Sequence, residues 1–86
     1  MKEFTYTITD PVGIHARPAG ILVKTIKDLG SAVTITNAAG KSAAGSKLMA
    51  LMGLAIKQGE TITVALDGPT EDQDAQTLEQ FFKDNL

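Results

Sequence analysis

The only histidine and the only arginine of this chain, His15 and Arg17, stand two residues apart in the segment GIHARPAG at residues 13–20. A neutral imidazole is a nucleophile that can accept a phosphoryl group. A guanidinium donates charge-assisted hydrogen bonds to phosphate oxygens and offsets their charge. These residue types at this spacing point to phosphate chemistry, with His15 as the phosphorylated group and Arg17 as its charge partner.

The same segment has the sequence of a helix start. Pro18 suits a first helical turn, where its missing N–H is not needed, and the residue before a proline avoids the α region. We therefore place the helix boundary at Arg17, within one or two residues. Because the first N–H groups of a helix bind anions, we expect the backbone of Ala16 and Arg17 to bind phosphate. The helix N-terminus and the cation should lower the pKa of His15.

Residue chemistry alone leaves a second interpretation open. A lone histidine is often a polar surface residue or a satisfied structural one, and a lone arginine is often a solvated charge. The glycines beside the pair and the helix start make the two interpretations about equally strong.

Length and composition describe one globular domain over residues 1–86, with 43% hydrophobic and 21% charged residues. The chain has no cysteine, so disulfides and thiolate metal sites are excluded, and a reducing cytosol suits it. The longest apolar stretch, residues 48–56, is far too short for a membrane span, and the N-terminus has no apolar signal core. We expect a soluble, cytoplasmic protein that does not insert into the membrane.

The charge pattern argues against nucleic acid as a partner. Ten acidic and eight basic residues give a formal net charge of -2, and the lysines are scattered along the chain. A nucleic-acid-binding domain would normally show a basic face. We expect no nucleic acid among the partners.

Hydrophobic periodicity predicts the element order β-α-β-β-α-β-α. Alternating residues mark strands, and apolar residues at intervals of three or four mark amphipathic helices. Four short strands and three helices with tight connections predict an α+β open-faced β-sandwich, a four-stranded antiparallel sheet with the three helices on one face. The strands are expected at residues 4–9, 32–36, 41–44 and 61–66, and the helices at residues 18–29, 48–55 and 70–82.

Capping and turn residues predict the helix ends. Gly30 should end the first helix, Ser46 should cap the second, and Gln58-Gly59 should close it. The sequence of residues 70–73 resembles a capping box for the last helix. Three acidic residues near that start should favour the helix dipole and face solvent, namely Glu71, Asp72 and Asp74.

Three features together resemble the HPr family, the histidine-containing phosphocarriers of the bacterial phosphoenolpyruvate-dependent sugar phosphotransferase system. They are the GIHARPA block at residues 13–19, the helix from Leu48 to Gly59 with its ending at residues 57–59, and the element order. The resemblance covers the whole chain. It implies a phosphoryl carrier, a monomer without cofactor or metal, and not an enzyme that releases a product.

The resemblance implies a relay through His15. Phosphorylated enzyme I would donate a phosphoryl group to Nδ1 of His15, and His15 would pass it to a histidine of the IIA component of a sugar transporter. Arg17 would stabilise the charge. His15 should therefore be accessible to both partners. Two alternatives remain: a paralogous carrier in a nitrogen-type regulatory relay that uses the same histidine, and a non-catalytic interaction domain that has no use for the pair.

A docking surface is also implied by the resemblance. In the family, the second helix joins Ala16, Gly20 and Lys24 in the contact with partners. We expect Leu51 and Leu54 to be core residues. For the other large apolar residues of this helix we favour the interface, because flexible methionines adapt to several partners. They are Leu48, Met49 and Met52.

Many family members carry a regulatory serine at the start of the second helix, which an ATP-dependent HPr kinase/phosphorylase modifies. Counting back from Gly59, that position falls on Lys47. Ser46 lies one residue earlier, because the turn at residues 37–40 is one residue longer than usual. A regulatory role of Ser46 is therefore doubtful, and its plain reading is a helix cap.

Overall fold

The computed structural model describes residues 1–11, 13–14 and 16–86, so Val12 and His15 lie outside the described residues. The order of elements is the one that the sequence predicts. The elements are β1 (Lys2–Thr7), α1 (Ala16–Lys27), β2 (Ala32–Thr36), β3 (Ser42–Ala44), α2 (Leu48–Met52), β4 (Thr61–Asp67) and α3 (Glu71–Asn85).

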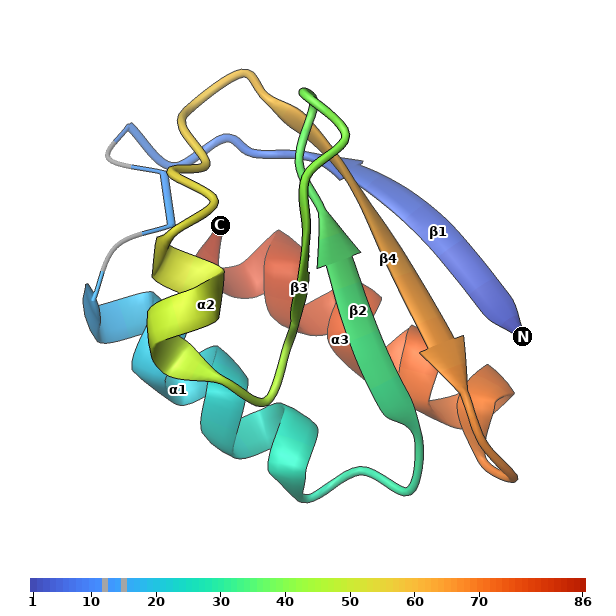
Figure 1. Ribbon diagram of the computed structural model, residues 1–86. Helices are drawn as coiled ribbons and strands as arrows, with labels where there is room; N and C mark the ends of the chain where they lie inside the picture. Colours follow the sequence, from blue (N-terminus) through green and yellow to red (C-terminus); the bar gives the residue numbers. More distant parts are fainter. Residues whose placement is uncertain (12, 15) are drawn as a thin grey trace.

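The four strands form one open antiparallel sheet in the order β1-β4-β2-β3. Figure 1 shows α1 and α3 packed on one side of this sheet and α2 beside α1 and β3. The predicted open-faced β-sandwich is confirmed. The strand limits differ by one or two residues from those expected: β1 begins and ends two residues earlier, β3 begins one residue later and β4 ends one residue later.

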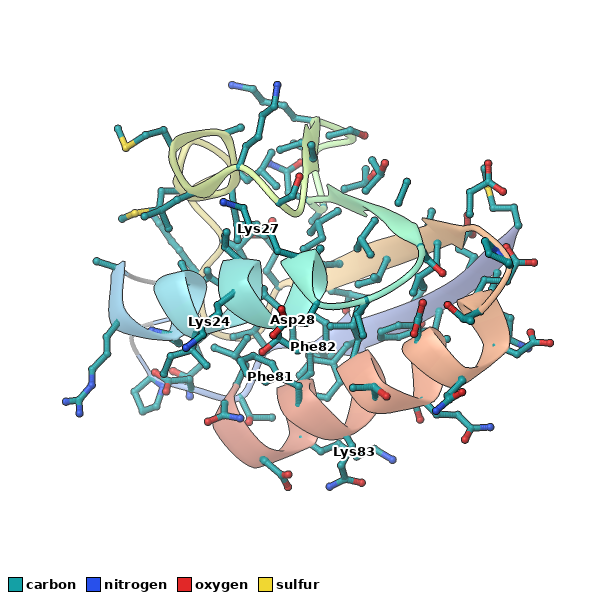
Figure 2. The ribbon with its side chains drawn as sticks, turned by 90° about the horizontal axis from the view of Figure 1, so that it is seen from below. Lys24, Lys27, Asp28, Phe81, Phe82 and Lys83 are labelled. Carbon is teal, nitrogen blue, oxygen red and sulfur yellow. The ribbon has the colours of Figure 1, made fainter. Side chains whose placement is uncertain are left out.

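The core lies between the sheet and the helices. Alternate residues of β4 point to the helices and are buried, as the period of two requires. On α3, the ring of Phe82 is fully buried, with its centroid 5.4 Å from that of Tyr6 and 6.1 Å from that of Phe4. Its neighbour Phe81 is half-buried, and the two rings meet edge to face with their centroids 6.2 Å apart (Figure 2). The apolar stripes of α1 and α3 are buried at Ala19, Leu22, Val23, Ile26, Ala75 and Leu78.

Helix α1 begins at Ala16, one residue before the expected boundary at Arg17. Pro18 is then the third helical residue and still lies in the first turn, where its missing N–H has no partner to lose. The helix ends at Lys27, so the prediction that it continues to Gly30 was wrong. The two residues after it form tighter turns, in which each N–H bonds to the carbonyl oxygen three residues earlier.

Helix α2 ends at Met52, so the expected helix through Ala55 to Gly59 was wrong. The backbone of Gly53 still bonds to the carbonyl oxygen of Met49, but Ala55 has a φ of 52°, in the left-handed region. A left-handed residue cannot continue a right-handed helix, so the chain leaves α2 there.

Ser46 does not cap α2. The N-cap is Lys47, which has an extended backbone and no side-chain capping hydrogen bond to the described residues. The N–H of Lys47 bonds to the carbonyl oxygen of Ala44 at 3.1 Å. This turn places Ser46 before the cap, too early for its hydroxyl to serve the first helical amides.

The predicted capping box of α3 is also wrong. Thr70 is the N-cap, but its side chain makes no capping hydrogen bond within the described residues. Its hydroxyl donates instead to Oδ2 of Asp74, at 2.7 Å. The reciprocal contact from Gln73 is likewise not found among the described side chains.

Asp74 does not face solvent as expected. It is 6% exposed, and its Oδ2 accepts a hydrogen bond of 2.6 Å from the hydroxyl of Ser31. This hydrogen bond, opposed by desolvation and assisted by the hydroxyl of Thr70 and the amides of Gly30 and Ser31, lowers the pKa of Asp74. Glu71 is half-buried, and of the three acids only Asp72 is exposed. The partner Ser31 lies 43 residues away in the sequence, so local sequence around Asp74 does not reveal its burial.

Candidate functional site

The chain before α1 is held against the segment that follows α2. Gly13 has a φ of 76°, and its N–H bonds to the carbonyl oxygen of Asp10 at 3.0 Å. The N–H of Ile14 bonds to the carbonyl oxygen of Ile56 at 3.1 Å, and the side chains of Ile14 and Ile56 are buried. A Cβ on Gly13 would lie 2.4 Å from that same oxygen, so only glycine fits.

The first turn of α1, residues 16–19, carries no acidic side chain of its own. Ala16 and Arg17 are exposed. Arg17 has no ion-pair partner within the part of the chain that the structure describes. Free N–H groups at a helix start and a nearby guanidinium together suit an anion. The structure thus brings the predicted phosphate-binding backbone to the surface, next in sequence to His15.

His15 itself lies outside the described residues. Its predicted exposure and its predicted lowered pKa therefore stay predictions. Among the residues that are described, no group of three or more acidic or histidine side chains could hold a metal ion. None of the described helices has the length and apolar character to cross a membrane.

Helix α2 exposes an apolar patch, which consists of Leu48, Met49 and Met52. Their exposed fractions are 37%, 81% and 37%. Leu51 and Leu54 are buried in the core, as predicted. Exposure and burial of these residues thus agree with the expectation, and a role of the exposed ones in partner contact stays a prediction.

The predicted contact residues of α1, Ala16, Gly20 and Lys24, follow one another at intervals of four residues and so lie along one side of that helix. Gly20 is half-buried, and Lys24 is exposed. In Figure 2, Lys24 leaves α1 on the side of α3, whereas Lys27 leaves it on the side of α2. Lys27, which was not among the predicted contact residues, therefore points toward the α2 patch.

A second residue that sequence reasoning missed is Ile21, which is 49% exposed on α1. It lies four residues after Arg17 and so shares its helix face. The signal was available, because Ile21 does not fit the spacing of the buried stripe. An apolar residue on the polar face of an amphipathic helix is a candidate for contact with a partner.

Comparison with known proteins shows which family has this sequence and fold. The sequence model described as "PTS HPr component phosphorylation site" matches residues 2–84. The chain belongs to the HPr family. Members of the HPr family are phosphocarriers of the phosphotransferase system and not classical enzymes, so this chain is such a phosphocarrier.

Individual HPr proteins resemble the chain over nearly its full length. Phosphocarrier protein HPr of Lysinibacillus sphaericus is 40% identical over 78 residues, which cover 91% of this chain and 88% of the relative. HPr of Mycoplasma capricolum is 41% identical over 80 residues, or 93% and 89% of the two chains. The solved structure of the histidine-containing phosphocarrier protein from Mycoplasma superposes with a TM-score of 0.90 at 38% identity, covering 96% of this chain and 93% of that one.

Proposed function

We propose that this phosphocarrier relays a phosphoryl group from phosphorylated enzyme I, through His15, to IIA components of sugar transporters in the cytoplasm. In the first step, Nδ1 of neutral His15 attacks phosphorus, and the bond between phosphorus and enzyme I breaks. The second step repeats this exchange with a IIA histidine as the nucleophile. A single domain of this size serves the relay as a monomer.

The observation that carries the proposal is the open first turn of α1 directly after His15. This turn contains exposed Ala16 and Arg17 and no acid, so nothing in the turn itself competes for an anion. A phosphoryl group on His15 brings negative charge to this place. The helix amides and the guanidinium of Arg17 would stabilise that charge.

The relay is tested by incubating the protein with phosphoenolpyruvate and enzyme I and measuring acid-labile, base-stable phosphate. We expect label on the wild type and none on His15→Ala. Arg17→Ala should remain folded and accept phosphate about tenfold more slowly, because a charge-assisted contact is lost. Lys83→Ala, which removes a cation from α3, serves as the charge control. An unlabelled wild type, or equal labelling of His15→Ala, contradicts the proposal.

We further propose that the partners dock on the α2 patch together with Ala16, Gly20 and Lys24. A shuttle needs a small, transient contact, and exposed methionines adapt to more than one partner surface. Gly20 supports this assignment. A Cβ at Gly20 would meet no atom within 4 Å, so the fold itself does not require glycine in the middle of α1. Glycine there lets a partner approach the helix backbone closely.

The proposed function does not include regulation through Ser46. The N-cap position of α2 belongs to Lys47, and Ser46 is half-buried in the turn before it. Incubation with ATP and an HPr kinase/phosphorylase, followed by mass spectrometry, should therefore find no phosphate on this residue. Phosphate that maps to Ser46 would add the regulatory branch to the function.

A further inference from the structure

The segment that follows α2 connects the α2 patch with the chain just before His15. Helix α2 ends at Met52, and the N–H of Ala55 bonds to the carbonyl oxygen of Met52 at 3.1 Å. Ile56 comes next, and its carbonyl oxygen accepts the N–H of Ile14. Four residues thus lead from the exposed end of α2 to Ile56, whose hydrogen bond with Ile14 holds the chain before α1 in place.

Ala55 has the only left-handed backbone among the non-glycine residues that the structure describes, with a φ of 52°. A residue with a Cβ adopts this conformation only at a cost in free energy, so glycine is the usual residue where the chain turns left-handed after a helix. Strain of this kind persists where the surrounding contacts hold the backbone in place.

Contacts on both sides hold Ala55 in this conformation. Before it, Leu54 is buried, and its carbonyl oxygen accepts a hydrogen bond of 3.1 Å from Nδ2 of Asn37. After it, Ile56 is 3% exposed, and its carbonyl oxygen is aimed at Ile14 and lies against Gly13. The left-handed step turns the chain between two buried, hydrogen-bonded residues.

We propose that Ala55 is a positioning residue for phosphoryl transfer. Its left-handed backbone directs the carbonyl oxygen of Ile56 at the N–H of Ile14 and so fixes the chain where it enters His15 and the first turn of α1. Ala55 acts through Ile56 and Ile14 and does not contact the phosphoryl group. The proposal rests on the proposed relay through His15.

The test compares two substitutions of Ala55. Ala55→Gly accepts a positive φ without strain, whereas the β-branched side chain of Ala55→Val strongly disfavours it. The matched control is Ala32→Val, which places the same side chain on the exposed, extended backbone of β2. Each variant is assayed for amide hydrogen exchange of Ile14 by NMR and for phosphoryl transfer from enzyme I, separated into kcat and KM.

We expect Ala55→Val to accelerate exchange of the Ile14 amide and to lower kcat by about tenfold, because small displacements of a reacting group slow transfer strongly. KM should change little, because the docking residues remain. Ala55→Gly and Ala32→Val should keep both the Ile14 protection and the kcat of the wild type.

A second variant, Asn37→Asp, covers the case in which Ala55→Val does not fold. It keeps the Oδ1 atom that accepts the N–H groups of Ala39 and Lys41, but it loses the Nδ2 donor to Leu54. It should also expose the Ile14 amide and lower kcat.

The outcomes separate the two proposals. A wild type that enzyme I does not label overturns the relay and this inference with it. A labelled wild type, together with a folded Ala55→Val or Asn37→Asp that keeps the kcat or the Ile14 protection of the wild type, overturns the positioning role alone.

Discussion

The starts of α1 and α3 differ in the charged residues that stand near the positive end of the helix dipole. The first turn of α3 contains Glu71, Asp72 and Asp74, whereas the first turn of α1 contains no acid. At α3 the chain supplies its own anions to the positive end of the helix. The first turn of α1 contains an arginine in place of acids. The difference supports the proposal that the start of α1 binds an anion from outside, whereas the acids of α3 stabilise their own helix.

The Asp74 cluster shows what an anion bound by amides and hydroxyls looks like when it is part of the fold. Oδ2 of Asp74 accepts two short hydrogen bonds, from the hydroxyls of Ser31 and Thr70, and the amides of Gly30 and Ser31 add to them. The proposed phosphoryl group on His15 would also meet helix amides at α1, with the guanidinium of Arg17 in place of the hydroxyls. In the proposed relay, however, that anion would arrive and leave with each transfer.

The largest expected effect on stability concerns Gly13, which packs against Ile56 just before α1. Gly13→Ala should lower the free energy of unfolding by roughly 3 kcal/mol, because the new Cβ would meet Ile56 and a positive φ would be strained. Gly40→Ala is the control: its φ is 86°, but a Cβ there meets no atom within 4 Å. It should cost only about 1 kcal/mol. Urea denaturation of the two variants measures the difference, and equal losses would show that the contact with Ile56 is unimportant.

Removing the internal anion should have the next largest effect. Asp74→Ala leaves the hydroxyls of Ser31 and Thr70 without their acceptor, so we expect a loss of about 2 kcal/mol in the free energy of unfolding. Asp72→Ala, at an exposed neighbour, should cost about 0.5 kcal/mol or less. Equal losses of the free energy of unfolding for the two variants would show that the hydrogen bonds of Asp74 do not stabilise the fold.

The acid dependence of stability should depend on Asp74. The folded state lowers its pKa below the ordinary value of 3.8, chiefly through the Ser31 hydrogen bond. The stabilisation is therefore fully present above that value and disappears as the pH falls through the folded pKa. Asp74→Asn, which keeps an acceptor oxygen but does not titrate, should show a shallower loss of stability in acid. Parallel acid curves for wild type and variant would contradict this assignment.

The element order and most of the core follow from local patterns. Alternation and helical spacing depend only on neighbouring residues, and they place Leu51 and Leu54 in the core correctly. His15 and Arg17 are conspicuous for a similar reason, since their types and spacing lie within one short segment. The roles predicted for these two residues stay predictions.

Features that depend on distant partners could not be predicted in this way. Asp74 looks like a surface acid at a helix start, and its burial requires Ser31, which is 43 residues away. The end of α2 was misplaced because the left-handed residue is Ala55, where the usual glycine signal is missing. The fit of Gly13 against Ile56 likewise joins two segments that no local pattern connects.

A smaller effect should separate stability from docking on α1. Gly20→Ala should raise the free energy of unfolding by up to about 1 kcal/mol, because alanine is the better helix former and its Cβ meets no neighbour. The same methyl group should weaken docking and raise KM for enzyme I. Thermal unfolding and steady-state transfer measure the two effects, and an unchanged KM would remove Gly20 from the proposed interface.

The smallest change in stability tests the comparison of the two helix starts most directly. Ala16→Glu places an acid in the first turn of α1, as in α3, and should stabilise the fold by about 0.5 kcal/mol through the helix dipole. The same carboxylate would compete with the phosphoryl group for the amides and for Arg17, so transfer to His15 should become slower. Ala16→Gln, of similar size without the charge, should show neither effect fully. A variant that is more stable and transfers phosphate as fast as the wild type would show that the absence of acids from this turn has no function.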